Sequence, residues 1–170
     1  NVIKALLTLP LAGVKLIVIG QKGAQFAARL SHQVEVEGVY TNWPVIPAPT
    51  DVRPIAATAI ELFTNRLVDR VSVLYTDFES TIRQVTRLRD LLPIDPAAIL
   101  APEDVARLTR TETLFEPSPA AVLEYVVPRL FEIQIYQAAL EAAASEQAAR
   151  MVAMKNASDN AKELTEDLTL

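Results

Sequence analysis

The chain has 170 residues, of which 51% are hydrophobic and 22% are charged, and it contains no cysteine and one histidine, His32. This composition fits one globular domain with an additional element, and it excludes disulfides, thiolate nucleophiles and metal clusters built on cysteine or histidine. The net charge of −5 argues against nucleic acid as a partner. Lysines interrupt the apolar stretches before they reach the ~20 residues of a membrane span.

The first part of the chain alternates between helical and strand patterns. A β-branched run that ends at Gly20 predicts a buried strand, and Thr50 with Asp51 predicts the N-cap of a later helix. Three prolines in the segment that begins at Trp43 predict a loop. The expected elements in chain order are an opening helix from Val2, a strand over 14–19, a helix over 21–30, an edge strand around 34–37, a loop over 43–49 and a helix over 52–67.

The middle of the chain is less regular. Residues 71–76 predict a second strong strand, whereas 78–92 fit either a strand that continues past a bend or a helix, and we favour a strand over 80–86. Prolines make 93–116 a connection with at most a short helix at 102–107. From Pro119 onward the pattern is helical, and Pro128 is expected to kink or interrupt the helix. Bulky apolar residues between 119 and 140 are expected to pack onto the domain itself.

Alternation of helices and strands predicts an α/β fold with an open, mostly parallel, Rossmann-like sheet and flanking helices. We expect this domain to span 1–117 and to be followed by C-terminal helices over 118–170. If the opening helix is a crossover connection, the strand that should precede it is missing from this chain.

No catalytic constellation is visible. Gly20–Gly23 lies at a strand-to-helix turn, but it lacks the spacing of a phosphate-binding loop, so we interpret it as a tight turn. Tyr75, Asp77 and Glu79 follow a strand where α/β sheets often bind ligands, yet their spacing is ordinary for a solvated strand end. His32 has no nucleophile motif beside it. We therefore predict no catalytic, cofactor-binding or metal-binding residues.

The last part of the chain carries the clearest pattern. Eight steps from Leu140 to Leu168 cover 28 residues, a mean spacing of 3.5 that is typical of a left-handed coiled-coil seam. Small residues dominate the seam, so a partner helix can approach closely. The predicted seam consists of Ala144, Ala148, Met151, Met154, Ala157, Ala161, Leu164 and Leu168. We expect 140–170 to form a coiled coil.

The same region resembles a known family. The run ASEQAARMVAMKNASDNA over 144–161 is similar to the C-terminal signature of the gamma subunit of the rotary, proton-driven ATP synthase. Further segments resemble that family: LFEPSP over 114–119, PRLFEIQIY over 128–136, VIGQKG over 18–23, and the stretch from YTDF at 75–78 to LLPI at 91–94. The resemblance covers essentially the whole chain.

This resemblance implies a non-catalytic rotor subunit that transmits torque between the membrane c-ring and the catalytic head. It implies two long helices that wind together as the rotor shaft, of which this chain would lack the N-terminal helix, the first strand and the C-terminal tip. The implied partners are the epsilon subunit, the c-ring and the alpha and beta subunits, and the implied place is the cytoplasmic face of a bacterial plasma membrane, held peripherally through the c-ring. Leu130, Phe131 and Glu132 would lie near the c-ring or the epsilon subunit.

Two other classes of function remain open from the residues alone. A small α/β enzyme domain would bind a nucleotide or a metal near Gly20 or Asp77. A helical-pairing adaptor would use the same seam without a motor.

Overall fold

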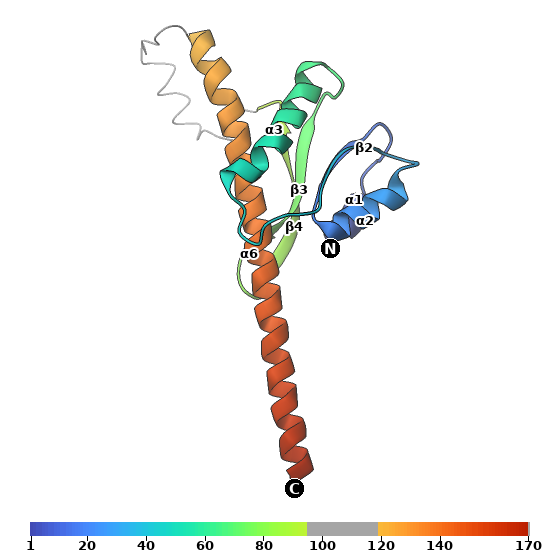
Figure 1. Ribbon diagram of the computed structural model, residues 1–170, viewed down its shortest axis with the longest axis vertical. Helices are drawn as coiled ribbons and strands as arrows, with labels where there is room; N and C mark the ends of the chain where they lie inside the picture. Colours follow the sequence, from blue (N-terminus) through green and yellow to red (C-terminus); the bar gives the residue numbers. More distant parts are fainter. Residues whose placement is uncertain (95–118, 170) are drawn as a thin grey trace.

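The structure is a computed structural model that describes residues 1–94 and 119–169. Its elements are α1 (Val2–Leu7), β1 (Lys15–Ile19), α2 (Gln21–Leu30), β2 (Glu35–Tyr40), α3 (Pro49–Thr64), β3 (Val71–Phe78), β4 (Gln84–Leu92) and α6 (Pro119–Thr169). The first half of α6 lies against the other elements, and its second half projects away from them (Figure 1). The predicted α/β class with flanking helices and a long C-terminal helix is confirmed. The connection expected over 93–116 and its short helix fall almost entirely outside the described residues.

Two pairs of strands form the β structure. β1 and β2 are parallel and are connected by α2, and Lys15 on β1 forms an ion pair of 2.6 Å with Glu35 on β2. β3 and β4 are antiparallel. Only residues 79–83 separate them, which is too few for the crossover that a parallel pair requires. The strand expected over 80–86 is therefore shifted, because the turn occupies its first residues and β4 extends to Leu92.

Helix α2 agrees with its predicted bounds and packs closely on β1. Gly20, at the N-cap, has a φ of 92°, a conformation that favours glycine. A Cβ atom at Gly23 would lie 2.6 Å from Val18 Cγ1. Gly20 therefore serves the turn, and Gly23 allows the close helix–strand contact.

Helix α3 begins and ends three residues earlier than predicted. Pro49 fits the first helical position, where no backbone N–H is needed. The Ala48 backbone N–H donates to Asp51 Oδ2 at 2.7 Å, and the Asp51 N–H donates to the Ala48 carbonyl at 3.0 Å. Asp51 thus closes the helix start from its third position instead of preceding the helix.

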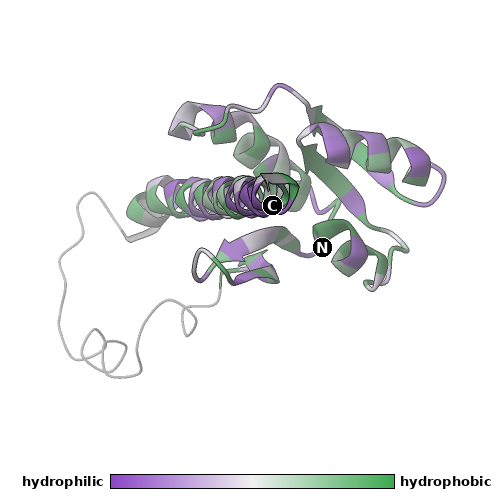
Figure 2. Ribbon diagram, turned by 90° about the horizontal axis from the view of Figure 1, so that it is seen from below, coloured by the Kyte–Doolittle hydropathy of each residue, from purple (hydrophilic) through white to green (hydrophobic). Residues whose placement is uncertain are grey.

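The hydrophobic core joins α3, β4 and α6. Its buried residues are Val52, Ile55, Ala56 and Ala59 from α3, Leu91 and Leu92 from β4, and Phe131 and Ile135 from α6. Figure 2, seen from below along α6, shows the other elements above, below and to the right of the helix. The helix runs through Pro128 without the predicted interruption, and Phe131 just beyond it is 1% exposed. α6 is therefore an integral part of the core.

Replacing Phe131 by alanine should lower the free energy of unfolding by about 3–5 kcal/mol, because it removes the largest buried side chain that α6 places in the core. Ile133→Ala is the matched control on the same helix, and its 57% exposed side chain predicts a change below about 0.5 kcal/mol. Urea unfolding followed by circular dichroism measures both. Equal losses would contradict this placement of α6.

Candidate functional site

The carboxylates considered for chemistry at the end of β3 form ion pairs within the chain. Asp77 and Glu79 both form ion pairs with Arg87 from β4, the latter at 2.8 Å, and Glu79 also pairs with Arg83 at 2.8 Å. Their charges are thus neutralised within the β3–β4 hairpin. Across the described ranges, no three His, Cys, Asp or Glu side chains come together as a metal site.

The backbone polar groups of Gly20, at the strand-to-helix turn, also have hydrogen-bond partners within the chain. The Gly20 N–H donates to the Tyr40 carbonyl at 2.8 Å, and the Gly20 carbonyl accepts from the Ala24 N–H at 3.0 Å. His32 is exposed in the turn after α2. These contacts agree with a tight turn and a surface histidine.

None of the helices described in residues 1–94 and 119–169 combines the length and hydropathy needed to cross a bilayer.

The distinctive surface of the chain is the far side of α6, which we call the outer face: Val126, Leu130, Ile133, Leu140, Ala144, Met151 and Met154. At about 100° per residue, Ile133 and Leu140 lie opposite the buried Phe131. Bulky residues between 119 and 140 therefore divide between two sides, and only one side packs onto the domain as expected. The outer face is an apolar strip without a covering element among the described residues.

The projecting half of α6 also exposes apolar side chains. Met151 and Met154 are more than half exposed, and Leu164 and Leu168 are 63% and 85% exposed. Ala148 differs from the rest of the predicted seam, because it is buried within this chain. From Met151 onward, the side chains of the predicted seam are exposed.

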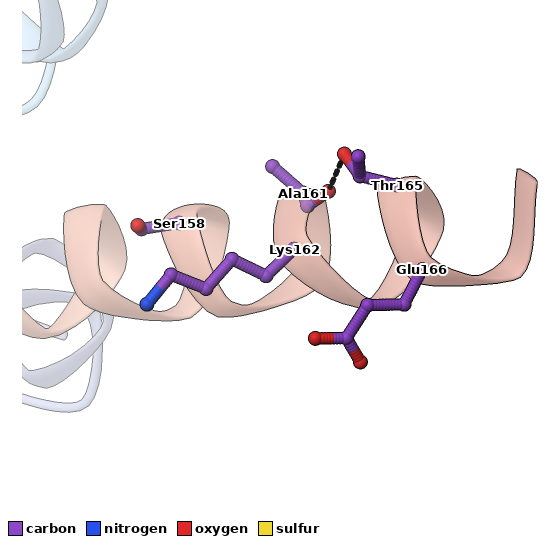
Figure 3. Close-up of a pocket in the computed structure, with 5 residues that line it drawn as sticks. All are labelled: Ser158, Ala161, Lys162, Thr165 and Glu166. Carbon is purple, nitrogen blue, oxygen red and sulfur yellow. Dashed lines mark hydrogen bonds between the residues drawn. The ribbon is translucent and has the colours of Figure 1, made fainter. Parts of the chain in front are cut away.

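Small side chains leave a pocket on the surface of the projecting helix. Ser158 and Ala161 line a surface pocket together with Lys162, Thr165 and Glu166 (Figure 3). The Thr165 hydroxyl donates to the Ala161 carbonyl at 2.8 Å, so that side chain folds back onto its own helix. The pocket lies on one helix and is not enclosed, which does not suit binding of a small molecule.

The three residues implied as a contact with other subunits lie in different surroundings. Phe131 belongs to the core, so its side chain is not on the surface. Leu130 is partly exposed on the outer face, and Glu132 forms an ion pair of 2.6 Å with Arg129. The Phe131 ring packs within this chain, so Leu130 and Glu132 are the members of this group with side chains at the surface. The resemblance implied all three residues together and did not distinguish Phe131 from Leu130.

Polar groups hold α6 near the point where it leaves the domain. The Ser145 hydroxyl donates to the Thr76 carbonyl on β3 at 3.3 Å. Tyr75, also on β3, is 5% exposed, and burial together with the negative charge of Glu141 raises the pKa of its hydroxyl. The Arg89 guanidinium lies 5.8 Å from the centre of the Tyr75 ring and acts in the opposite direction. Tyr75 is therefore neutral at ordinary pH.

Comparison with known proteins gives a consistent picture. The family model described as ATP synthase matches residues 1–170. The chain is 43% identical over 157 residues to the ATP synthase gamma chain of Roseiflexus castenholzii, which covers 92% of this chain and 51% of that protein. It is 45% identical, with the same coverage, to the gamma chain of Roseiflexus sp. strain RS-1. The chain thus spans about half the length of these curated relatives.

Solved structures share the fold. The central stalk and c-ring structure of the Tetrahymena thermophila mitochondrial ATP synthase contains a chain with a TM-score of 0.59 and 24% identity, covering 84% of this chain and 60% of that chain. A chain of the Euglena gracilis mitochondrial ATP synthase rotor gives a TM-score of 0.54 and 18% identity, covering 88% of this chain and 57% of that chain. At these identities the likeness concerns the fold alone.

The raised pKa of Tyr75 predicts how stability depends on pH. The folded state holds the hydroxyl proton more tightly than the unfolded chain, whose tyrosine pKa is 10.0. This contribution is fully present below pH 10 and is lost as the pH rises through the folded-state pKa. The unfolding free energy should therefore fall less steeply above pH 10 in Tyr75→Phe than in the parent chain. Urea titrations at pH 9, 10 and 11 measure the slopes.

Tyr125→Phe is the control for that experiment, because Tyr125 is exposed. Lys15, whose pKa is raised by Glu35 and Glu37, loses its ion pairs at similarly high pH in every variant. The difference between variants therefore isolates the tyrosine. Identical slopes for all three proteins would show that the environment of Tyr75 does not favour its neutral form.

Proposed function

Because this chain belongs to the ATP synthase family, we propose that it serves as a part of the gamma subunit that transmits torque within the rotor and takes no part in catalysis. The single observation that carries this proposal is α6, a helix of 51 residues with one half in the core and one half projecting. At about 1.5 Å per residue such a helix is about 75 Å long. It can carry a rotation over that distance.

The domain and the shaft have separate tasks in this proposal. Residues 1–117 form the foot of the rotor, 118–170 form its helical part, and the shaft proper begins near residue 140. Ion pairs and turn contacts occupy the sites where an enzyme of this fold would bind its ligand, which supports a mechanical role. Catalysis would belong to the beta subunits, and no cofactor is required of this chain.

The exposed seam supports a second long helix as the partner of α6. Ala157 and Ala161 allow the two backbones to approach closely, while Met151, Met154 and Leu164 supply apolar contact area. The foot would bind the epsilon subunit and the c-ring, with Leu130 and Glu132 as candidate contacts, and the alpha and beta subunits would surround the far end. The chain would then act at the cytoplasmic face of a bacterial plasma membrane, held there through the c-ring.

Enlarging the seam should disrupt the shaft. Ala157→Leu combined with Ala161→Leu adds bulk where the partner helix is closest, at a cost of about 1–3 kcal/mol for each overpacked position. We expect the full-length subunit with both changes to lose most ATP-driven rotation in the assembled complex. Rotation of single molecules by a bead assay measures the effect.

Asn156→Leu is the control, because it enlarges the neighbouring position outside the seam. Ala148 is avoided because it is buried within this chain. Unchanged rotation in the double variant would contradict the shaft pairing, and an equal loss in the control would show that added bulk anywhere on the helix is harmful.

The foot should bind the cognate epsilon subunit. We expect a one-to-one complex of this chain with epsilon in size-exclusion chromatography and calorimetry, with circular dichroism on the same sample to show that the chain is folded. A folded chain that does not bind the epsilon subunit would favour the helical-pairing adaptor. Saturable binding of a nucleotide or a metal would favour the small enzyme domain.

A further inference from the structure

Two buried polar atoms lie at the contact between α6 and β3 without a hydrogen-bond partner. They are the Tyr75 hydroxyl on β3 and Glu141 Oε2 on α6, and they are the buried side-chain atoms of this kind within the part of the chain that the structure describes. The other carboxylate oxygen, Glu141 Oε1, accepts from Gln137 Nε2 at 3.0 Å. Buried polar groups in proteins are almost always paired, so this donor and this acceptor call for an explanation.

The two groups act on one another. Glu141 raises the pKa of Tyr75 through its charge and through its closeness as a hydrogen-bond acceptor, so its carboxylate lies near the phenol although the two atoms do not meet hydrogen-bond geometry. A neutral tyrosine donates one hydrogen bond, and a carboxylate only accepts. Their hydrogen-bonding chemistry is therefore complementary.

The surrounding contacts explain why such a pair matters here. Deeper in the domain, α6 packs through apolar side chains such as Phe131, Ile135 and Ala138. Contacts of this kind are non-directional, so they oppose separation more than they oppose sliding or turning. Glu141 and Ser145 lie one helical turn apart and meet adjacent residues of β3, Tyr75 and Thr76. Directional contacts are thus placed where the helix leaves the domain.

We propose that the Tyr75 hydroxyl donates to the Glu141 carboxylate and that this pair, with the Ser145–Thr76 hydrogen bond, forms a polar clamp that fixes the rotation and height of α6 on β3. The clamp rests on the proposed rotor function, because a shaft that turns within its own foot transmits no torque. Tyr75, Glu141 and Ser145 are positioning residues in this role.

Hydrogen exchange in the assembled complex tests the pair itself. Tyr75→Phe and Glu141→Leu should each increase exchange of the backbone amides over 141–148 by about ten-fold, as expected from the loss of one hydrogen bond to a charged group. The double variant should exchange no faster than either single variant, because both remove the same contact. Glu141→Gln keeps an acceptor and should restore much of the protection. Tyr125→Phe and Glu146→Leu are the exposed controls.

Proton pumping tests the positioning role. In vesicles that contain the complete enzyme, the clamp variants should pump fewer protons per ATP hydrolysed while hydrolysis itself continues. Additive exchange effects in the double variant, or none at all, would overturn the clamp and leave the rotor proposal intact. Faster exchange with unchanged pumping would overturn its positioning role. If the seam variant Ala157→Leu with Ala161→Leu also left pumping unchanged, the rotor function itself would be wrong.

Discussion

Burial of one side of α6 is the constraint on which the rest of the structure depends. Phe131 and Ile135 complete a core that α3 and β4 cannot close alone. The strands form two sheets of two strands each, and a sheet of two strands needs packing against a helix to be stable. A helix held this firmly at its base can extend into solvent without support from the domain along its second half.

Local patterns predicted much of the fold, because they depend on neighbours in the chain. The bounds of α2 follow from Gly20 and the apolar spacing after it, and β3 follows from its β-branched run. The start of α3 was missed because Asp51 caps the helix from its third position, a reciprocal contact that a simple N-cap pattern does not describe. The turn at 79–83 was missed because no glycine or proline marks it.

The sequence predicted only part of the candidate surface on α6. Periodicity predicts a seam from Leu140 to Leu168, and its side chains are exposed from Met151 onward, so its pairing with a second helix stays a prediction. Nearer the domain both sides of the helix are apolar, so composition does not say whether Phe131 or Ile133 is covered. That choice depends on where α3 and β4 lie, which is set by contacts between residues far apart in the chain. The polar contacts of Glu141 and Ser145 with β3 also join residues far apart in the chain, so the sequence pattern did not predict them.

Pro128 has a mechanical consequence. Proline has no backbone N–H, so the helix lacks one hydrogen bond there and is more compliant than its neighbours. The anchor at Phe131 and the whole projecting half lie on the C-terminal side of this weak link. A torsional load applied between the domain and the tip therefore crosses an unbroken ladder of backbone hydrogen bonds, and the softest point of the rod stays outside the load path.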